Sequence, residues 1–245
     1  MLAFEPPLRV IGLAGDDAQL MWMGHRLAKS LLRAFLLTGA EVRVEGREHI
    51  VPGRRYIVVA NHQGFSKAAA VGLLRSLAFE ALDTARDADQ LRRSWQQLDS
   101  ADRRDAFVAA RAATRMAQLG ATDEGRQILR PFWDSVAELG AEDREVIAHG
   151  LVACVVGIGA DWLPRLESAS RAYPRDGAVA FATGCALAER QLWGKARLAL
   201  QQAADDATLP AASRRRAWRQ LAQLAHEEGD AARAADCYAA ASQIG

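Results

Sequence analysis

The spacing of apolar and polar positions changes along the chain near Ser66. Before it, Glu41–Glu45 alternates polar and apolar residues as an exposed strand does, and Tyr56–Ala60 is a continuous apolar run suited to a buried strand. A helix is expected ahead of them over residues 18–38, where apolar residues recur at helical spacing. The pattern therefore predicts a short α/β segment over residues 1–66.

After Ser66 the apolar positions recur at helical spacing almost without interruption. Short breaks that contain Asp, Gly or Pro divide the pattern into helices. The predicted helices cover residues 68–86, 88–98, 104–119, 122–138, 142–157, 161–172, 177–190, 193–205, 212–228 and 231–243. Helices joined by such short turns pack as antiparallel hairpins.

The last hairpin indicates a repeat. Its sequence, WRQLAQLAHEEGDAARAADCYAAA, matches the spacing of the tetratricopeptide repeat (TPR), a helical hairpin of about 34 residues. The small residues Ala222 and Ala234 would let the two helices approach closely. The space beside the neighbouring hairpin would be filled by the large side chains of Trp218, Leu221 and Tyr238.

The earlier hairpins match this spacing to different degrees. The hairpin directly before the last fits it with Gly184, Leu187, Ala196, Leu200 and Ala203. The hairpin of residues 110–132 fits more loosely, and that of residues 148–172 fits poorly, with Pro164 where alanine is expected. A generic helical bundle is the alternative. The spacing favours a mainly α fold, a right-handed, TPR-like α-solenoid over residues 67–245.

Composition supports this fold and excludes some classes of protein. Alanine, the strongest helix former, makes up roughly a fifth of the chain and is concentrated after Ser66. An apolar fraction of 50% excludes global disorder. The net charge of +1 argues against a nucleic-acid-binding protein. No run of about 20 apolar residues could span a membrane, so this chain alone is expected to be soluble.

No cluster of residues predicts a metal or cofactor site. Cys154, Cys185 and Cys237 form no CxxC motif and are expected to be small buried side chains. The histidines form no HxxxH pair, and the chain has no GxGxxG, GxxxxGK[ST] or GxSxG motif. We therefore expect no metal and no cofactor.

From about residue 67 onward the chain resembles the C-terminal TPR region of the HemY proteins of proteobacteria. The resemblance rests on ARDADQLRRSWQQLDSADRRD, on the hairpin around Gly120 and above all on Gln191–Arg197 (QLWGKAR). Those are inner-membrane proteins linked to haem biosynthesis. The resemblance implies a non-enzymatic scaffold that binds protein partners, such as haem-synthesis enzymes, at the bacterial inner membrane. Direct binding of haem or porphyrin is a further possibility. The membrane-anchoring stretch of that family is not visible here.

The segment VRVEGREHIVPGRRYIVVANHQGFS resembles the start of a lysophosphatidic acid acyltransferase. That family carries Asn-His-x-x-x-x-Asp after a buried strand, which implies His62 as a general base on the glycerol hydroxyl. Asn61 and His62 match, but Lys67 occupies the Asp position, where a cation cannot accept the imidazole N–H. The later motifs of the family are also missing. The alternative function is therefore an inactive glycerolipid acyltransferase fragment or fusion.

The two resemblances meet near Ser66. A natural gene fusion, a misassembled gene and an artificial chimera would each give such a sequence. We accordingly predict two parts, an incomplete acyltransferase-like α/β segment over residues 1–66 and a TPR-like helical domain over residues 67–245.

Candidate binding residues follow from TPR spacing. A TPR array binds along its concave face, which the first helix of each hairpin forms. In the last hairpin this face would hold a polar, mostly basic stripe of Arg216, Arg219, Gln223 and His226, suited to an acidic peptide or a propionate-bearing ligand. A solvated helix face is the alternative. The matching positions of the preceding hairpin are the apolar Ala178, Phe181, Cys185 and Ala188. Together the two would form a groove for an amphipathic partner helix.

Overall fold

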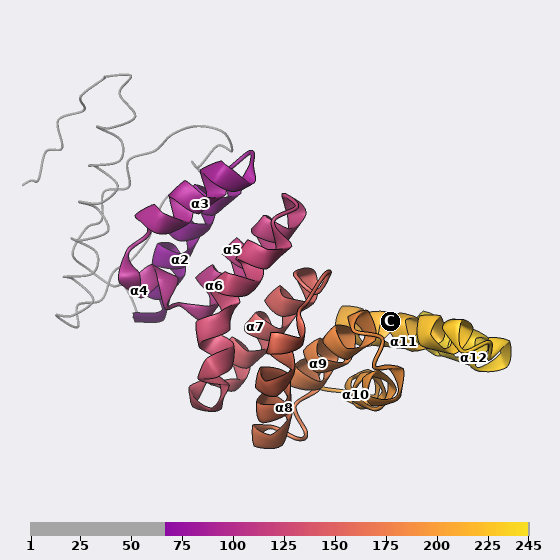
Figure 1. The fold of residues 1–245 in the computed structure, drawn as a ribbon. Coiled ribbons are helices and arrows are strands. Elements are labelled where there is room, and N and C mark those ends of the chain that lie inside the picture. The colour runs from indigo at the N-terminus through magenta and orange to yellow at the C-terminus, as the bar shows by residue number, and fades with distance from the viewer. Residues whose placement is uncertain (1–66, 245) are drawn as a thin grey trace, which may run out of the picture. The chain divides into compact units, whose positions relative to one another are not determined.

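The computed structural model describes residues 67–244, and this part of the chain is helical without a strand (Figure 1). The predicted α/β segment, with its strands and His62, lies outside the described residues. The described helices are α2 (Lys67–Asp83), α3 (Ala88–Gln97), α4 (Ser100–Arg103), α5 (Ala106–Gln118), α6 (Thr122–Asp134), α7 (Ala141–Ala153), α8 (Leu163–Ala172), α9 (Gly177–Glu189), α10 (Trp193–Asp205), α11 (Ala211–Glu227) and α12 (Ala231–Gln243), with short 3-10 helices at Val136–Glu138 and Ala160–Trp162.

The chain from Arg75 onward forms one compact unit, whereas the first two turns of α2 belong to another. Within the unit from Arg75, α5 pairs with α6, α9 with α10, and α11 with α12. The first helices of successive hairpins, α5, α7, α9 and α11, begin at Ala106, Ala141, Gly177 and Ala211. These starts lie 34 to 36 residues apart, the period of a TPR. The prediction of a mainly α, TPR-like α-solenoid is thus confirmed.

The third hairpin of the unit is irregular. α8 packs mainly on α9 and α6 rather than on its own partner α7. The chain leaves α7 after Ala153 and passes through Gly157, whose φ of +72° ends any continuation of the helix. Pro164 then occupies the first turn of α8. The poor match of this hairpin to the repeat therefore has a structural counterpart.

A buried arginine holds the loop between α7 and α8. Arg126 of α6 is 3% exposed, and its guanidinium donates to the backbone carbonyls of Cys154, Val156 and Gly157. These carbonyls would otherwise lack a helical partner at the end of α7. The loop is therefore fixed by a neighbouring hairpin and not by its own sequence.

Helix α9 lies at the centre of the packing. Every residue from Gly177 to Leu187 is buried, because α7, α8, α10 and α11 all contact this helix. Its neighbour α10 approaches so closely that a Cβ on Gly184 would lie 2.7 Å from Leu200 Cγ. Ala196 and Ala203 of α10 are fully buried. The small residues of the sequence therefore occur where helices touch.

Ionic ties join each hairpin to the next. These pairs span 28 to 32 residues of sequence, close to one repeat, and they include Arg75–Asp105, Arg92–Glu124, Arg111–Asp83, Arg165–Asp134, Arg144–Asp176 and Arg197–Glu228. Most are partly exposed, and each such pair contributes little by itself. The Arg144–Asp176 pair is the most enclosed, with side chains 13% and 16% exposed.

Candidate interaction surface on helix α11

All four residues of the predicted stripe are exposed on α11. Arg216, Arg219, Gln223 and His226 follow one another at spacings of three and four residues, so they share one side of the helix. The opposite side is buried in the unit through Ala217, Leu221, Ala222, Leu224 and Ala225. The structure therefore brings the four side chains together in solvent, while their binding role stays a prediction.

The two arginines of this stripe have no ionic partner among the described residues. Arg216 and Arg219 are in none of the ion pairs of this part of the chain, in contrast to Arg144 and Arg197, which bind carboxylates of neighbouring hairpins. Two unpaired guanidiniums three residues apart on one helix repel each other modestly. An added carboxylate would relieve this repulsion, and a guanidinium can bind it through two hydrogen bonds.

The predicted apolar end of the groove is closed. Ala178, Phe181 and Cys185 are 6%, 1% and 5% exposed, so the prediction of an open apolar surface is wrong at these three positions, and the fourth, Ala188, is half-buried. The reason is that α7, α8, α10 and α11 all pack on α9. Ser213 lies in the first turn of α11.

Ser213 forms a bridge across α9 to α7. The His149 Nε2 and the Ser213 Oγ lie 2.8 Å apart, and the His149 ring meets the Phe181 ring edge to face at 6.4 Å between centroids. The bridged residues are 64 positions apart, about two repeats. Sequence reasoning gave His149 no role, since no local signal marks a contact at that separation.

The His149 side chain of this bridge is partly buried and is affected by the charges of Glu145 and Arg216. Burial lowers the pKa of His149 below its ordinary value, Glu145 on the same helix raises it, and the Arg216 guanidinium lowers it further. Burial also raises the pKa of the Cys185 thiol to about 12, which keeps it protonated and unreactive near neutral pH.

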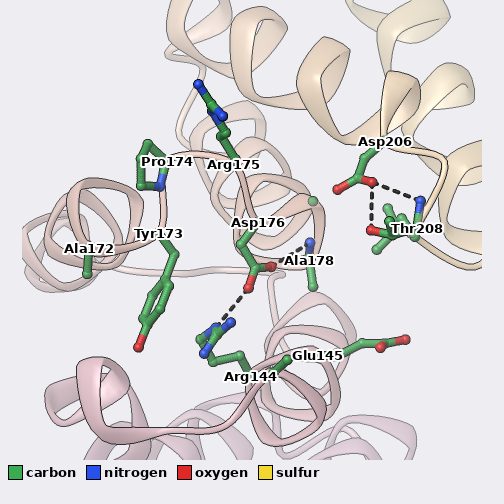
Figure 2. Close-up of a pocket in the computed structure, with 13 residues that line it drawn as sticks. Arg144, Glu145, Ala172, Tyr173, Pro174, Arg175, Asp176, Ala178, Asp206 and Thr208 are labelled. Carbon is green, nitrogen blue, oxygen red and sulfur yellow. Dashed lines mark hydrogen bonds and ion pairs between the residues drawn. The ribbon is translucent and has the colours of Figure 1, made fainter.

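A hollow of about 440 Å³ lies at the start of α7 and α9 and beside the turn before α11 (Figure 2). Two of the carboxylates that line it, Asp176 and Asp206, are already occupied. Asp176 accepts from the backbone N–H groups of Ala178 and Val179 at the start of α9, and from Arg144 Nε at 2.8 Å. The hollow is therefore a structural junction in which these groups are not free for a ligand.

Asp206 completes the junction. Its carboxylate accepts from the Thr208 hydroxyl, which contributes most to lowering the pKa of Asp206, and from the backbone N–H groups of Thr208, Gly177 and Leu209. A Cβ on Gly177 would lie 2.3 Å from Asp206 Oδ2, so only glycine fits. The two carboxylates that flank the α9–α10 hairpin in sequence thus cap the start of α9.

Two further findings concern metals and membranes. No three His, Cys, Asp or Glu side chains within residues 67–244 lie close enough together to hold a metal ion. In the same part of the chain, none of the helices combines the length and apolar character needed to cross a bilayer.

Comparison with known proteins gives few matches. No family model matches the chain, and no curated protein matches it. Among solved structures, one described as "MamA MSR-1 C2" is similar, with 19% sequence identity and a TM-score of 0.40. The similarity covers 71% of this chain and 95% of that chain. At this level of similarity the description of the fold rests on the repeat period and the hairpin packing of the chain itself.

Proposed function

We propose that this protein is a non-enzymatic interaction scaffold whose α11 stripe binds an acidic segment of a partner protein. The observation that carries the proposal is the pair of exposed arginines, Arg216 and Arg219, without an ionic partner among the described residues. They stand on a helix whose other side is buried, so their positions are set in advance of binding. A rigid site loses little conformational entropy when it binds.

The chemistry of the stripe favours a peptide carboxylate over a neutral ligand. Arg216 and Arg219 lie one turn apart and Gln223 follows one turn further on. An extended or helical partner with acidic side chains at similar spacing could pair with both guanidiniums and place an amide acceptor near Gln223. We expect the affinity to fall with salt, since exposed charge pairs are screened.

The test is a charge reversal on the stripe. The double variant Arg216→Glu and Arg219→Glu should weaken binding of a fluorescent glutamate-rich peptide at least about tenfold, measured by anisotropy at low salt. The matched control reverses Arg93 and Arg103, which are exposed on α3 and α4. Equal loss in both double variants would mean that only net charge matters, and unchanged binding in the stripe variant would exclude the site.

A narrower proposal names the partners. We infer from the QLWGKAR resemblance that they include enzymes of late haem synthesis at the bacterial inner membrane. The run opens α10, where Lys195 is exposed and Trp193 packs partly on the core. Co-purification of those enzymes with the wild-type chain, and not with the stripe variant, would support this. A porphyrin titration followed in the Soret band tests direct ligand binding instead.

The acyltransferase alternative depends on Asn61 and His62, which lie outside the described residues. Acylation of lysophosphatidate that is lost in His62→Ala would establish it. Absence of turnover in the wild-type chain would leave the scaffold as the better proposal.

A further inference from the structure

The His149–Ser213 bridge has a longer span in sequence than the ion pairs that join neighbouring hairpins. The ion pairs and side-chain bonds that join hairpins connect positions about one repeat apart, whereas this bond connects α7 to α11 over the intervening α9. It is also the bond that lies over Phe181. Whether this hydrogen bond is formed therefore decides whether the first turn of α11 is held against α7.

The first turn of α11 has few other attachments. Pro210 precedes the helix, and the start of α11 has no side-chain cap. The backbone N–H groups of Ser213 and Arg214 both donate to the single carbonyl of Pro210. α11 contacts α9 much less than it contacts α10 and α12. This turn can therefore loosen while the rest of α11 stays packed.

We propose that the His149–Ser213 bridge is a pH-sensitive clamp, and that protonation of His149 loosens the first turn of α11 from α9. The inference goes beyond the proposed function, because it requires no partner and does not depend on the stripe binding one.

The groups that face His149 fix the direction of the effect. From α7 it meets Glu145, from α9 the Phe181 ring with the Cys185 thiol one turn further on, and from α11 Ser213 and Arg216. Glu145 favours the charged imidazole, while burial and Arg216 oppose it, and burial has the largest effect. A loosened first turn would let water reach the imidazolium.

The pH window follows from linkage. A histidine whose pKa is lowered in the closed state stabilises that state fully above its unperturbed pKa of about 6.5. This stabilisation is lost as the pH falls below that value. The clamp should therefore be closed at neutral pH and loosen in mildly acidic solution.

Two measurements on the full chain test the clamp. An NMR titration should give His149 a midpoint below that of the same residue in the urea-unfolded chain. Amide exchange at Ser213 and Arg214, corrected for its intrinsic pH dependence, should speed up at least about tenfold between about pH 7.5 and about pH 5.5.

Variants separate the clamp from general acid weakening. His149→Gln should remove the pH dependence of exchange, and His226→Gln, an exposed control on α11, should retain it. Ser213→Ala should show fast exchange at both pH values. Far-UV circular dichroism checks that each variant is folded. Exchange at Ser213 that does not change with pH in the wild type, or that still changes in His149→Gln, would overturn the proposal.

Discussion

At the scale of single residues, packing in this unit depends on the absence of side-chain atoms. Gly184 of α9 faces Leu200 of α10, and a Cβ there would lie 2.7 Å and 2.9 Å from the Leu200 Cγ and Cδ2 atoms and 3.0 Å from its backbone nitrogen. The backbone contact cannot be relieved by a rotamer change alone. The position thus tolerates no added carbon without separating the two helices.

We expect Gly184→Ala to lower the free energy of unfolding by about 1–3 kcal/mol through overpacking. Urea denaturation measures the change as a shift of the midpoint. Gly194→Ala on α10 is the matched control, because a Cβ there meets nothing within 4 Å. That variant should be neutral or stabilising by up to about 1 kcal/mol. A Gly184→Ala protein as stable as the wild type would contradict the close approach of α9 and α10.

At the scale of helices, the start of α9 is supported by two carboxylates. Asp176 binds two backbone N–H groups and Arg144, and the carboxylate of Asp206 binds the N–H of Gly177. By comparison, Asp230 at the start of α12 accepts from Arg233 N alone and is exposed. In both caps an Asp carboxylate accepts from backbone N–H groups, but Asp176 is enclosed and Asp230 is exposed.

This difference predicts unequal costs of removing the two caps. Asp176→Ala should destabilise by about 2–4 kcal/mol, since it removes a cap and leaves the enclosed Arg144 without its partner. Asp230→Ala should cost about 1 kcal/mol. Thermal and urea unfolding of both variants give the comparison. Equal costs would show that the Arg144 pair adds nothing to the cap.

Helix positions were largely predictable from sequence, and the exceptions have identifiable causes. The predicted helix over residues 142–157 ends at Ala153, because Arg126, 28 residues or more away in sequence, holds the carbonyls that follow. Residues 100–103 form a short helix, α4, where a break was expected. The periodicity of apolar residues predicts which side of a helix is buried, but it does not predict a hydrogen bond made by a residue distant in sequence.

The same limit applies to the candidate site. The helical spacing of Arg216, Arg219, Gln223 and His226 was sufficient to place them together on an exposed side. The closure over Phe181 was not predictable, because it depends on a bridge between positions 64 residues apart. The predicted division near Ser66 stays a prediction.

At the scale of the whole unit, protection of the helices should differ strongly. Four helices pack on α9. Among the described helices, α11 is the one that makes extensive contacts with α12. We therefore expect amide exchange of α9 to be at least about tenfold slower than that of α12. Native-state exchange followed by mass spectrometry measures both. Equal protection would mean that the unit opens only as a whole.

The one-repeat spacing of the ionic ties also limits how far a local disturbance can travel. Each ion pair couples a hairpin to its immediate neighbour alone. The motions of two hairpins should therefore become less correlated with every hairpin that separates them. Loss of one enclosed tie, such as Arg144–Asp176, would weaken the coupling between the hairpins on either side of it, which the packing of α7 on α9 still joins. The His149–Ser213 bond, which passes over α9, would by contrast couple two hairpins that are not direct neighbours.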